Sequence, residues 1–148
     1  GQKGGLARVA HLRKLLKQEN PNTYTFLAGD LVSPSALSQS IVNGTTLNGR
    51  QMIAAMNVLG VDYMTFGNHE FDLTEPDLIA RMNESRFTWI SSNVFVPNTN
   101  RSFASSVPYK VLEVESVRIL IFGLTIYQNK NYVRIIDLPE LIPFVKQF

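Results

Sequence analysis

Residues 67–72 read Gly-Asn-His-Glu-Phe-Asp, and they follow directly on the apolar run Val-Asp-Tyr-Met-Thr-Phe at 61–66. This pattern is typical of a strand that ends in a glycine and passes at once into side chains able to bind metal or move protons. Residues 23–28, Thr-Tyr-Thr-Phe-Leu-Ala, have the same design, because they lead into Gly29-Asp30. Two strands that deliver such groups at their carboxyl ends predict one shared site between them.

The rest of the chain predicts strands that alternate with helices. Helical periodicity occurs in three stretches, at residues 6–19, 47–59 and from Thr74 onward. Apolar runs that predict strands lie at 23–28, 61–66, 87–94, 108–114 and 117–124. Polar stretches at 31–46 and 95–107 predict loops, and residues 137–140 predict the start of a last helix.

The ends and faces of the predicted helices are marked by particular residue types. Gly4-Gly5 opens the first helix, Gly60 ends the second, and Thr74 caps the third. The first helix has apolar side chains near one face and charged side chains opposite. The apolar set is Leu6, Val9, Leu12, Leu15 and Leu16.

Alternating strands and helices predict an α/β fold with at least part of its sheet parallel. The helix at 47–59 serves as the crossover that makes the strands at 23–28 and 61–66 parallel. Ligands bind at the carboxyl ends of the strands in such sheets. We therefore expect Asp30 and residues 67–72 to lie at one edge.

Asp30 and Asn68 are candidate metal ligands. A carboxylate is able to bridge two cations, and an amide oxygen is a hard neutral ligand. Both suit Mg²⁺ or Mn²⁺ and are acceptable to Zn²⁺ or Fe²⁺. Two such metals about 4 Å apart clamp a phosphate ester and activate a hydroxide for in-line attack.

His69 and Asp72 are candidate catalytic residues. An imidazole beside the metals is able to protonate the leaving alkoxide or to stabilise charge on the phosphoryl group. Asp72, three residues later, is close enough to accept a hydrogen bond from His69 and raise its pKa. Glu70 is either a further site residue or a structural carboxylate, and the structural role is favoured. His11 is interpreted as a structural residue of the first helix.

Composition limits the other classes of function. The chain has 148 residues, is 45% hydrophobic and carries a formal net charge of +2, which does not favour nucleic acid as a partner. It has no cysteine, so thiolate metal sites and cysteine nucleophiles are excluded. No apolar run is long enough to span a membrane. No signal peptide is visible, but the chain begins at Gly1, so localisation stays open.

Together these motifs resemble the N-terminal catalytic domain of 5′-nucleotidase-type enzymes in the calcineurin-like metallophosphoesterase superfamily. The resemblance covers most of the chain, and the element at 67–72 is highly specific for this branch. It rests on Gly4-Gly5-Leu6-Ala7-Arg8, Gly29-Asp30, Leu59-Gly60-Val61-Asp62, residues 67–72 and Phe122-Gly123-Leu124-Thr125.

The resemblance implies a fold, a site and a reaction. Residues 1–148 would be part of one domain, a partial four-layer α/β/β/α sandwich that lacks flanking strands, with no second domain. Asp30 would bridge two divalent metals (Mn, Zn, Mg or Fe), Asn68 would bind the second, and His69 and Asp72 would be the catalytic dyad. The reaction implied is hydrolysis of phosphomonoesters, commonly nucleotides, and in some members of cyclic phosphodiesters.

The chain departs from the pattern of this superfamily on both sides of the motifs. An earlier Asp-x-His and a later Gly-His-x-His element are absent, because His11 and His69 are its only histidines. Ser33-Pro34-Ser35 stands where Gly-Ser or Gly-Thr is common. The resemblance therefore implies a fragment with an incomplete metal site, little turnover of its own, and flanking segments or a C-terminal domain as partners. The alternative is a non-catalytic pseudo-phosphatase module that binds a nucleotide or a protein.

The same expectation has a structural consequence. If the missing strands cover this sheet in the longer enzyme, the chain alone exposes an apolar edge through which it is able to associate.

Overall fold

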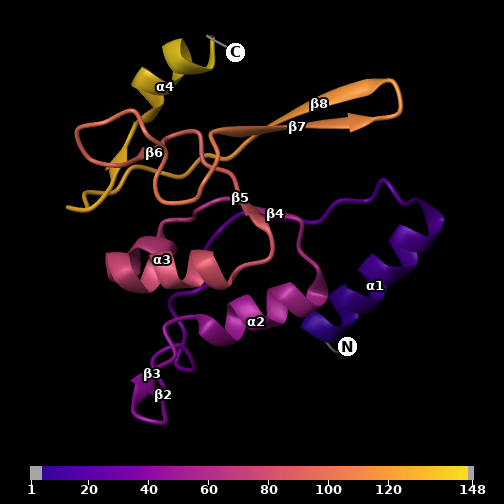
Figure 1. Ribbon diagram of the computed structural model, residues 1–148, viewed down its shortest axis with the longest axis horizontal. Helices are drawn as coiled ribbons and strands as arrows, with labels where there is room; N and C mark the ends of the chain where they lie inside the picture. Colours follow the sequence, from indigo (N-terminus) through magenta and orange to yellow (C-terminus); the bar gives the residue numbers. More distant parts are fainter. Residues whose placement is uncertain (1–4, 147–148) are drawn as a thin grey trace.

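The computed structural model describes residues 5–146, and its elements follow the predicted alternation of strands and helices (Figure 1). The helices among these residues are α1 (Leu6–Glu19), α2 (Arg50–Leu59), the 3₁₀ turn η1 (His69–Asp72), α3 (Glu75–Glu84) and α4 (Leu138–Val145). Gly4, half of the predicted Gly4-Gly5 helix start, lies outside the described residues, as do both ends of the predicted domain.

The strands are mostly short and form small sheets. They are β1 (Phe26–Leu27), β2 (Ile41–Val42), β3 (Thr45–Thr46), β4 (Tyr63–Met64), β5 (Thr88–Trp89), β6 (Val94–Phe95), β7 (Tyr109–Val114), β8 (Val117–Phe122) and β9 (Arg134–Ile135). The first central strand is shorter than the predicted run 23–28. Its backbone pairing nevertheless extends one residue further at the start, since Asp62 donates its N–H to the Thr25 carbonyl oxygen at 3.0 Å.

The central sheet has the strand order β1-β4-β5, and both of its pairings are parallel. In register, Leu27 lies opposite Met64, and Met64 lies opposite Trp89. The helix α2 lies between β1 and β4, which confirms the predicted crossover at 47–59, and α3 likewise lies between β4 and β5. The carboxyl ends of β1 and β4 therefore lie side by side.

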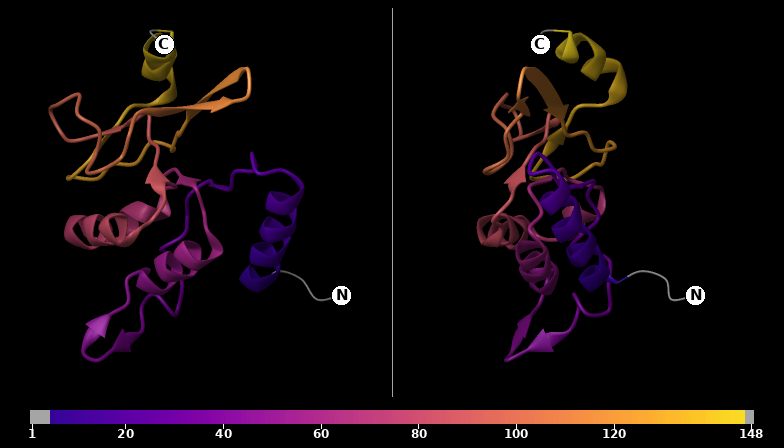
Figure 2. Two further views of the ribbon diagram at one scale, coloured as in Figure 1. Left: turned by 45° about the vertical axis from the view of Figure 1, so that its right-hand side comes forward. Right: turned by 90° about the vertical axis from the view of Figure 1, so that its right-hand side faces the viewer.

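Both α2 and α3 lie on one side of the central strands, and the β7–β8 hairpin and α4 lie on the other (Figures 1 and 2). Apolar side chains of the two helices and of the sheet fill the space between them. This core includes Ile53, Met56, Met64, Phe66, Leu78, Met82 and Trp89, each at most 3% exposed. Full burial of one such side chain stabilises the fold by roughly 1.5–3 kcal/mol.

Helix α3 begins immediately after the motif for the reason that the sequence predicts. The hydroxyl of Thr74 accepts a hydrogen bond from the Asp77 N–H, and Pro76 occupies the first turn. Helix α2 ends at Gly60, whose φ of 87° lies in the left-handed region that glycine favours. These two boundaries fix where strand β4 and its following loop are placed.

The predicted hairpin is confirmed: β7 and β8 pair antiparallel from Tyr109↔Phe122 to Val114↔Val117. Two other short pairings lie outside the predictions. Residues 41–46 form the β2–β3 hairpin inside the predicted loop 31–46, and β9 pairs with β6. The first has a local signal, since Asn43-Gly44 takes positive φ values at the turn.

The apolar stripe predicted on the first helix is not a packing face among the described residues. All five of its side chains are more than 40% exposed: Leu6, Val9, Leu12, Leu15 and Leu16. Arg13 ties the helix to the central strands, because it bonds the Thr25 hydroxyl at 2.9 Å and the Asp62 carboxylate at 3.3 Å, and Ala10 packs against the core. The apolar periodicity thus predicted the bounds of the helix correctly. The apolar side chains of the helix are nevertheless exposed in the described part of the chain.

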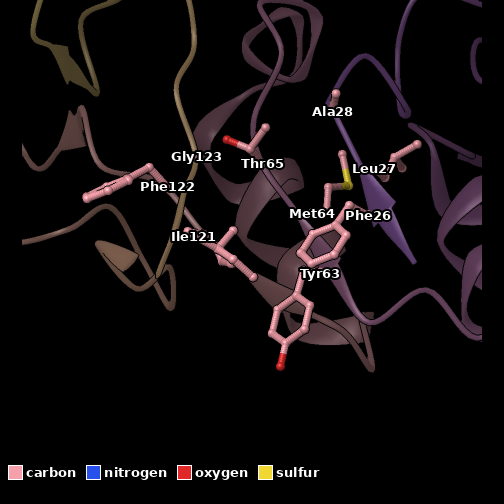
Figure 3. Close-up of a pocket in the computed structure, with 10 residues that line it drawn as sticks. Phe26, Leu27, Ala28, Tyr63, Met64, Thr65, Ile121, Phe122 and Gly123 are labelled. Carbon is pink, nitrogen blue, oxygen red and sulfur yellow. The ribbon is translucent and has the colours of Figure 1, made fainter. Parts of the chain in front are cut away.

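The expected apolar edge is present. Among the described strands β1 pairs only with β4, and Phe26 is 50% exposed while it stacks on the Tyr63 ring at 5.3 Å. A mostly apolar pocket opens beside these rings (Figure 3). Its lining also includes Ala28 and Thr65, which lie directly beyond the strands toward the candidate site.

No helix in residues 5–146 has the length and apolar character needed to cross a membrane.

Candidate functional site

The loops that follow β1 and β4 are in direct backbone contact. Gly29 has φ 84°, and a Cβ built on it would overlap the backbone nitrogen and Cα of Gly67. A Cβ on Gly67 would in turn overlap the Asp30 backbone nitrogen and carboxylate. Glycine is needed at both positions because any larger residue would push the loops apart. The glycines that precede Asp30 and Asn68 therefore let the two loops that carry the predicted metal ligands lie in contact.

The carboxylate of Asp30 contacts the loop that follows β4. Its Oδ1 accepts a hydrogen bond from the His69 backbone N–H at 3.0 Å. Asp30 itself has φ 57°, which is uncommon for a residue other than glycine. Asn68 comes directly before this N–H and forms the start of the turn η1. The structure thus places Asp30 against the loop that carries Asn68, as the sequence predicts.

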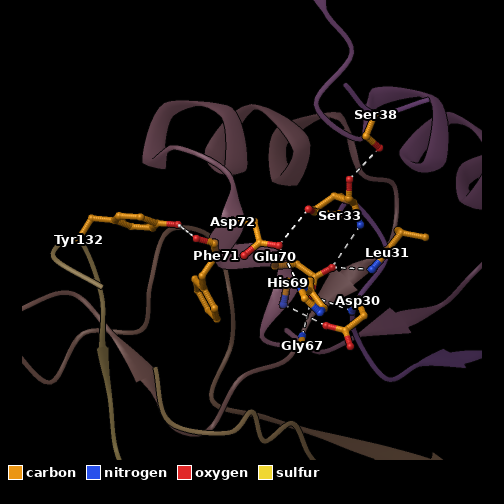
Figure 4. Close-up of polar contacts among 11 residues, drawn as sticks. Asp30, Leu31, Ser33, Ser38, Gly67, His69, Glu70, Phe71, Asp72 and Tyr132 are labelled. Atoms are coloured by element: carbon orange, nitrogen blue, oxygen red, sulfur yellow. Dashed lines mark hydrogen bonds and ion pairs between the residues drawn. The ribbon is translucent and has the colours of Figure 1, made fainter. Parts of the chain in front are cut away.

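Glu70 lies beneath both loops and has no exposed surface. Its Oε2 accepts hydrogen bonds from the N–H groups of Asp30 at 2.8 Å and Gly67 at 2.6 Å (Figure 4). Its Oε1 accepts from Leu31 at 2.6 Å and Val32 at 3.4 Å. Burial raises the pKa of the Glu70 carboxyl, and these four backbone donors oppose that shift. The contacts agree with the structural role that the sequence favoured.

His69 and Asp72 form the pair predicted from their spacing. The imidazole Nδ1 lies 2.8 Å from Asp72 Oδ2, so Nδ1 donates and Nε2 remains available for another partner. The hydrogen bond with Asp72 raises the pKa of His69 above its ordinary value of 6.5. Both side chains are more than a third exposed, so the imidazole is accessible from solvent.

Ser33 is a member of the site that sequence reasoning missed. Its hydroxyl donates to Asp72 Oδ2 at 3.0 Å, the same oxygen that accepts from His69. The segment Ser33-Pro34-Ser35 had signalled only a departure from the superfamily pattern. Its contact with Asp72 joins residues 39 positions apart, and no local spacing rule reveals that.

The turn that carries His69 and Asp72 is held by contacts of Phe71 and Tyr132. Phe71 is 1% exposed and packs on the ring of Phe66, with ring centroids 5.3 Å apart. The Tyr132 hydroxyl donates to the Leu73 carbonyl oxygen at 2.9 Å. Burial raises the pKa of Tyr132 to about 12, so this hydroxyl stays neutral and donates over the physiological range. Phe71 and Tyr132 thus hold the turn in place, while the side chains of His69 and Asp72 are exposed to solvent.

Asp30 and Asn68 fit part of a divalent metal centre. Their carboxylate and amide oxygens are the hard donors that such cations take. Within residues 5–146, however, no group of three or more His, Cys, Asp or Glu side chains is arranged to hold a metal ion. His11 lies exposed on α1 and is not among the residues of this site. The described residues therefore contain no complete coordination shell, and Asp30 and Asn68 stay predicted ligands.

Comparison with known proteins identifies the family of the chain. The family model of calcineurin-like phosphoesterases matches residues 2–142. A curated 5′-nucleotidase of Rattus norvegicus is 32% identical over 125 residues, which are 82% of this chain and 21% of that protein. The chain thus spans about a fifth of the length of such curated relatives.

Solved structures show the same fold. A 5′-nucleotidase precursor from Thermus thermophilus aligns with a TM-score of 0.77 and 26% identity, over 97% of this chain and 29% of that chain. A sulfate thiohydrolase from the same organism aligns with a TM-score of 0.76 but only 15% identity, over 97% and 27%. The predicted α/β class is confirmed, and the second similarity concerns the fold alone.

Proposed function

Because the chain belongs to the calcineurin-like phosphoesterase family, we propose that it serves metal-dependent hydrolysis of a phosphomonoester, of the 5′-nucleotidase type. The observation that carries this proposal is the meeting of two strand ends, where Asp30 contacts the loop of Asn68 and His69. We assign Asp30 and Asn68 as metal ligands, and His69 with Asp72 as the catalytic pair. The remaining ligands come from other segments of a longer polypeptide.

Two divalent metals, when bound, would orient the phosphate ester and supply an activated hydroxide. Asp30 and Asn68 would hold them through a carboxylate and an amide oxygen. Their identity is left open among Mn, Zn, Mg and Fe. The protein residues around them then have two tasks, which are to fix the ligands and to deliver a proton.

His69 is the proton donor in this proposal. Asp72 accepts from Nδ1, so the proton for transfer lies on Nε2 of the imidazolium. A hydroxide oxygen bonds to phosphorus while the bond from phosphorus to the ester oxygen breaks. The Nε2 proton moves to that ester oxygen, which leaves as an alcohol, and the phosphate product retains the attacking oxygen. Asp72 keeps the ring oriented and favours its protonated form.

The nucleotide class of substrate rests on relatives rather than on a pocket. The curated relative with 32% identity is named a 5′-nucleotidase, and the fold alone also occurs in a sulfate thiohydrolase. Because a fold does not fix a substrate, nucleoside 5′-monophosphates are proposed as the class to assay first.

A non-catalytic module is the second candidate, since the described residues supply only two of the expected ligands. The coding sequence on either side of this chain separates the two. An Asp-x-His upstream and a Gly-His-x-His downstream favour the enzyme. A genuine start near Gly1 and a stop near Phe148 favour the module.

The test is a phosphate-release assay on the protein encoded by the complete reading frame, with AMP and Mn²⁺. We expect hydrolysis that EDTA abolishes and that Asp30→Ala reduces to background. Asp62→Asn, at the opposite end of the same strands, should retain activity. The 148-residue chain alone should show no Asp30-dependent turnover. A full-length protein that binds AMP without Asp30-dependent hydrolysis would reject the enzymatic proposal in favour of the module.

A further inference from the structure

The carboxylate of Glu70 is a buried charged group that the proposed chemistry does not use. It has no exposed surface, so it is not placed to touch a substrate. Its two oxygens accept hydrogen bonds from four backbone N–H groups. Three of these belong to the loop after β1 and one to the loop after β4. One carboxylate group thus bonds the backbone of both loops that carry the proposed metal ligands.

Oxygen Oε2 joins the two loops directly. It accepts from Asp30 N at 2.8 Å and from Gly67 N at 2.6 Å, so one atom bonds the backbone of both strand ends. Each of these N–H groups lies at, or next to, a candidate metal ligand, Asp30 or Asn68. One carboxylate oxygen of Glu70 therefore holds the backbones of Asp30 and Gly67 at a fixed separation.

The bonds to Glu70 also hold Asp30 in an unfavourable backbone conformation. A residue other than glycine in the left-handed region is strained and persists only when its surroundings fix it. The N–H groups of Asp30 and Leu31 both end on Glu70. With its φ of 57°, Asp30 directs Oδ1 to the His69 N–H, which completes a ring of contacts through Glu70.

A neutral replacement of the same shape would break this arrangement. Every neighbour that bonds the Glu70 side chain is an N–H donor. In Glu70→Gln the amide –NH₂ would face donors rather than acceptors, and up to two backbone N–H groups would lose their partner. Buried donors without a partner are costly, so the loops would separate or turn.

We propose that Glu70 is the positioning residue of the metal site, which holds Asp30 and Asn68 at the separation that metal binding needs. This inference rests on the proposed function for the identity of the metal ligands. The contacts that carry it, however, are present without a metal. Glu70 does not touch the metal or the substrate in this account, and it acts through the two backbones.

The test uses the 148-residue chain and two readouts, Mn²⁺ affinity by EPR and amide hydrogen exchange by NMR. In Glu70→Gln we expect the Mn²⁺ dissociation constant to rise at least about tenfold. Exchange should accelerate at Asp30, Leu31, Val32 and Gly67, which bond Glu70. It should also accelerate at the His69 amide, which does not bond Glu70. Acceleration at His69 distinguishes a positioning role from the loss of the four local bonds.

Asp62→Asn is the matched control. Asp62 is also a partly buried carboxylate that ties the same two strands together, since it accepts from Thr25 N at 2.8 Å and from Arg13. It lies at the amino end of β4, away from the metal ligands. This variant should lose stability but keep both the Mn²⁺ affinity and the exchange rate of His69.

The outcomes separate this inference from the proposed function. A folded Glu70→Gln chain with unchanged Mn²⁺ affinity overturns the role of Glu70 and leaves the metal ligands standing. A wild-type chain that binds no Mn²⁺ contradicts the metal half-site, and the His69 exchange rate in Glu70→Gln then decides the inference alone. If Glu70→Gln does not fold, native-state exchange of the wild-type chain decides. The protection factors of the Asp30 and Gly67 amides should then agree within a factor of about three, and a larger difference overturns the proposal.

Discussion

The Asp30 carboxylate and the His69 backbone N–H are joined by a hydrogen bond of 3.0 Å, although the two residues are 39 positions apart. This bond connects the loop after β1 to the loop after β4 at the carboxyl edge of a parallel sheet. Asn68 lies immediately before the donor, and the His69 side chain follows it. One contact thus links a proposed bridging ligand, a proposed second ligand and a proposed proton donor.

Substitution of Gly29 tests how closely the loops must approach. Gly29 and Gly44 have similar positive φ values, 84° and 76°, but a Cβ would meet the Gly67 backbone at Gly29 and open space at Gly44. We expect Gly44→Ala to lower the free energy of unfolding by about 1–2 kcal/mol, from backbone strain alone. Gly29→Ala should cost about 1–3 kcal/mol more, because the overlap adds to the same strain.

Urea denaturation of both variants measures the difference. Equal losses of stability at Gly29 and Gly44 would show that the loops have room to separate, and the close approach would then not be required.

The pKa of His69 tests its pairing with Asp72. The hydrogen bond to Asp72 raises this pKa above 6.5, so the folded state favours the protonated ring. The stabilisation from this pair is fully present below pH 6.5 and is lost as the pH rises through the raised pKa. In Asp72→Asn we expect the His69 pKa to fall toward 6.5.

NMR titration of the imidazole C–H signals measures this pKa, and a His11→Gln variant assigns the signals of the two histidines. The stability difference between wild type and Asp72→Asn should also shrink as pH rises through the wild-type His69 pKa. A His69 pKa that Asp72→Asn leaves unchanged would remove Asp72 from the proposed pair.

The role of His69 as proton donor predicts a dependence on the leaving group. In the protein from the complete reading frame, His69→Asn should lower kcat for AMP by about 10²–10⁴-fold, the range typical of general acid catalysis. The loss should be much smaller for p-nitrophenyl phosphate, whose phenolate leaves without needing a proton. Steady-state kinetics on both substrates measure the ratio, and equal losses would assign His69 to binding rather than to proton transfer.

The strand ends and the residues that follow them could be predicted from the sequence, because the sequence signals there are local. Apolar runs that end in Gly29-Asp30 and Gly67-Asn68 define the two loops, and spacing within one turn places His69 near Asp72. The crossover helix α2 makes the strands parallel, so the two loops meet. The capping of α3 by Thr74 is likewise a short-range signal.

The contacts between distant segments could not be predicted from the sequence. Ser33 reaches Asp72, and Glu70 accepts from the loop after β1, only because the folded sheet brings these segments together. The apolar stripe of α1 was a true helical signal, yet what covers it is not determined by the helix itself. Periodicity describes an element, whereas burial depends on the neighbours that pack against it.

Mn²⁺ binding to the 148-residue chain tests the central claim most directly. EPR titration should be made on the wild-type chain and on Asp30→Ala and Asn68→Ala, with Asp62→Asn as the control. We predict specific Mn²⁺ binding that both ligand variants lose and the control retains, because the two strand ends already form half of a metal site. Absence of specific binding in a folded wild-type chain, or binding that survives both substitutions, would contradict the assignment of Asp30 and Asn68 as metal ligands.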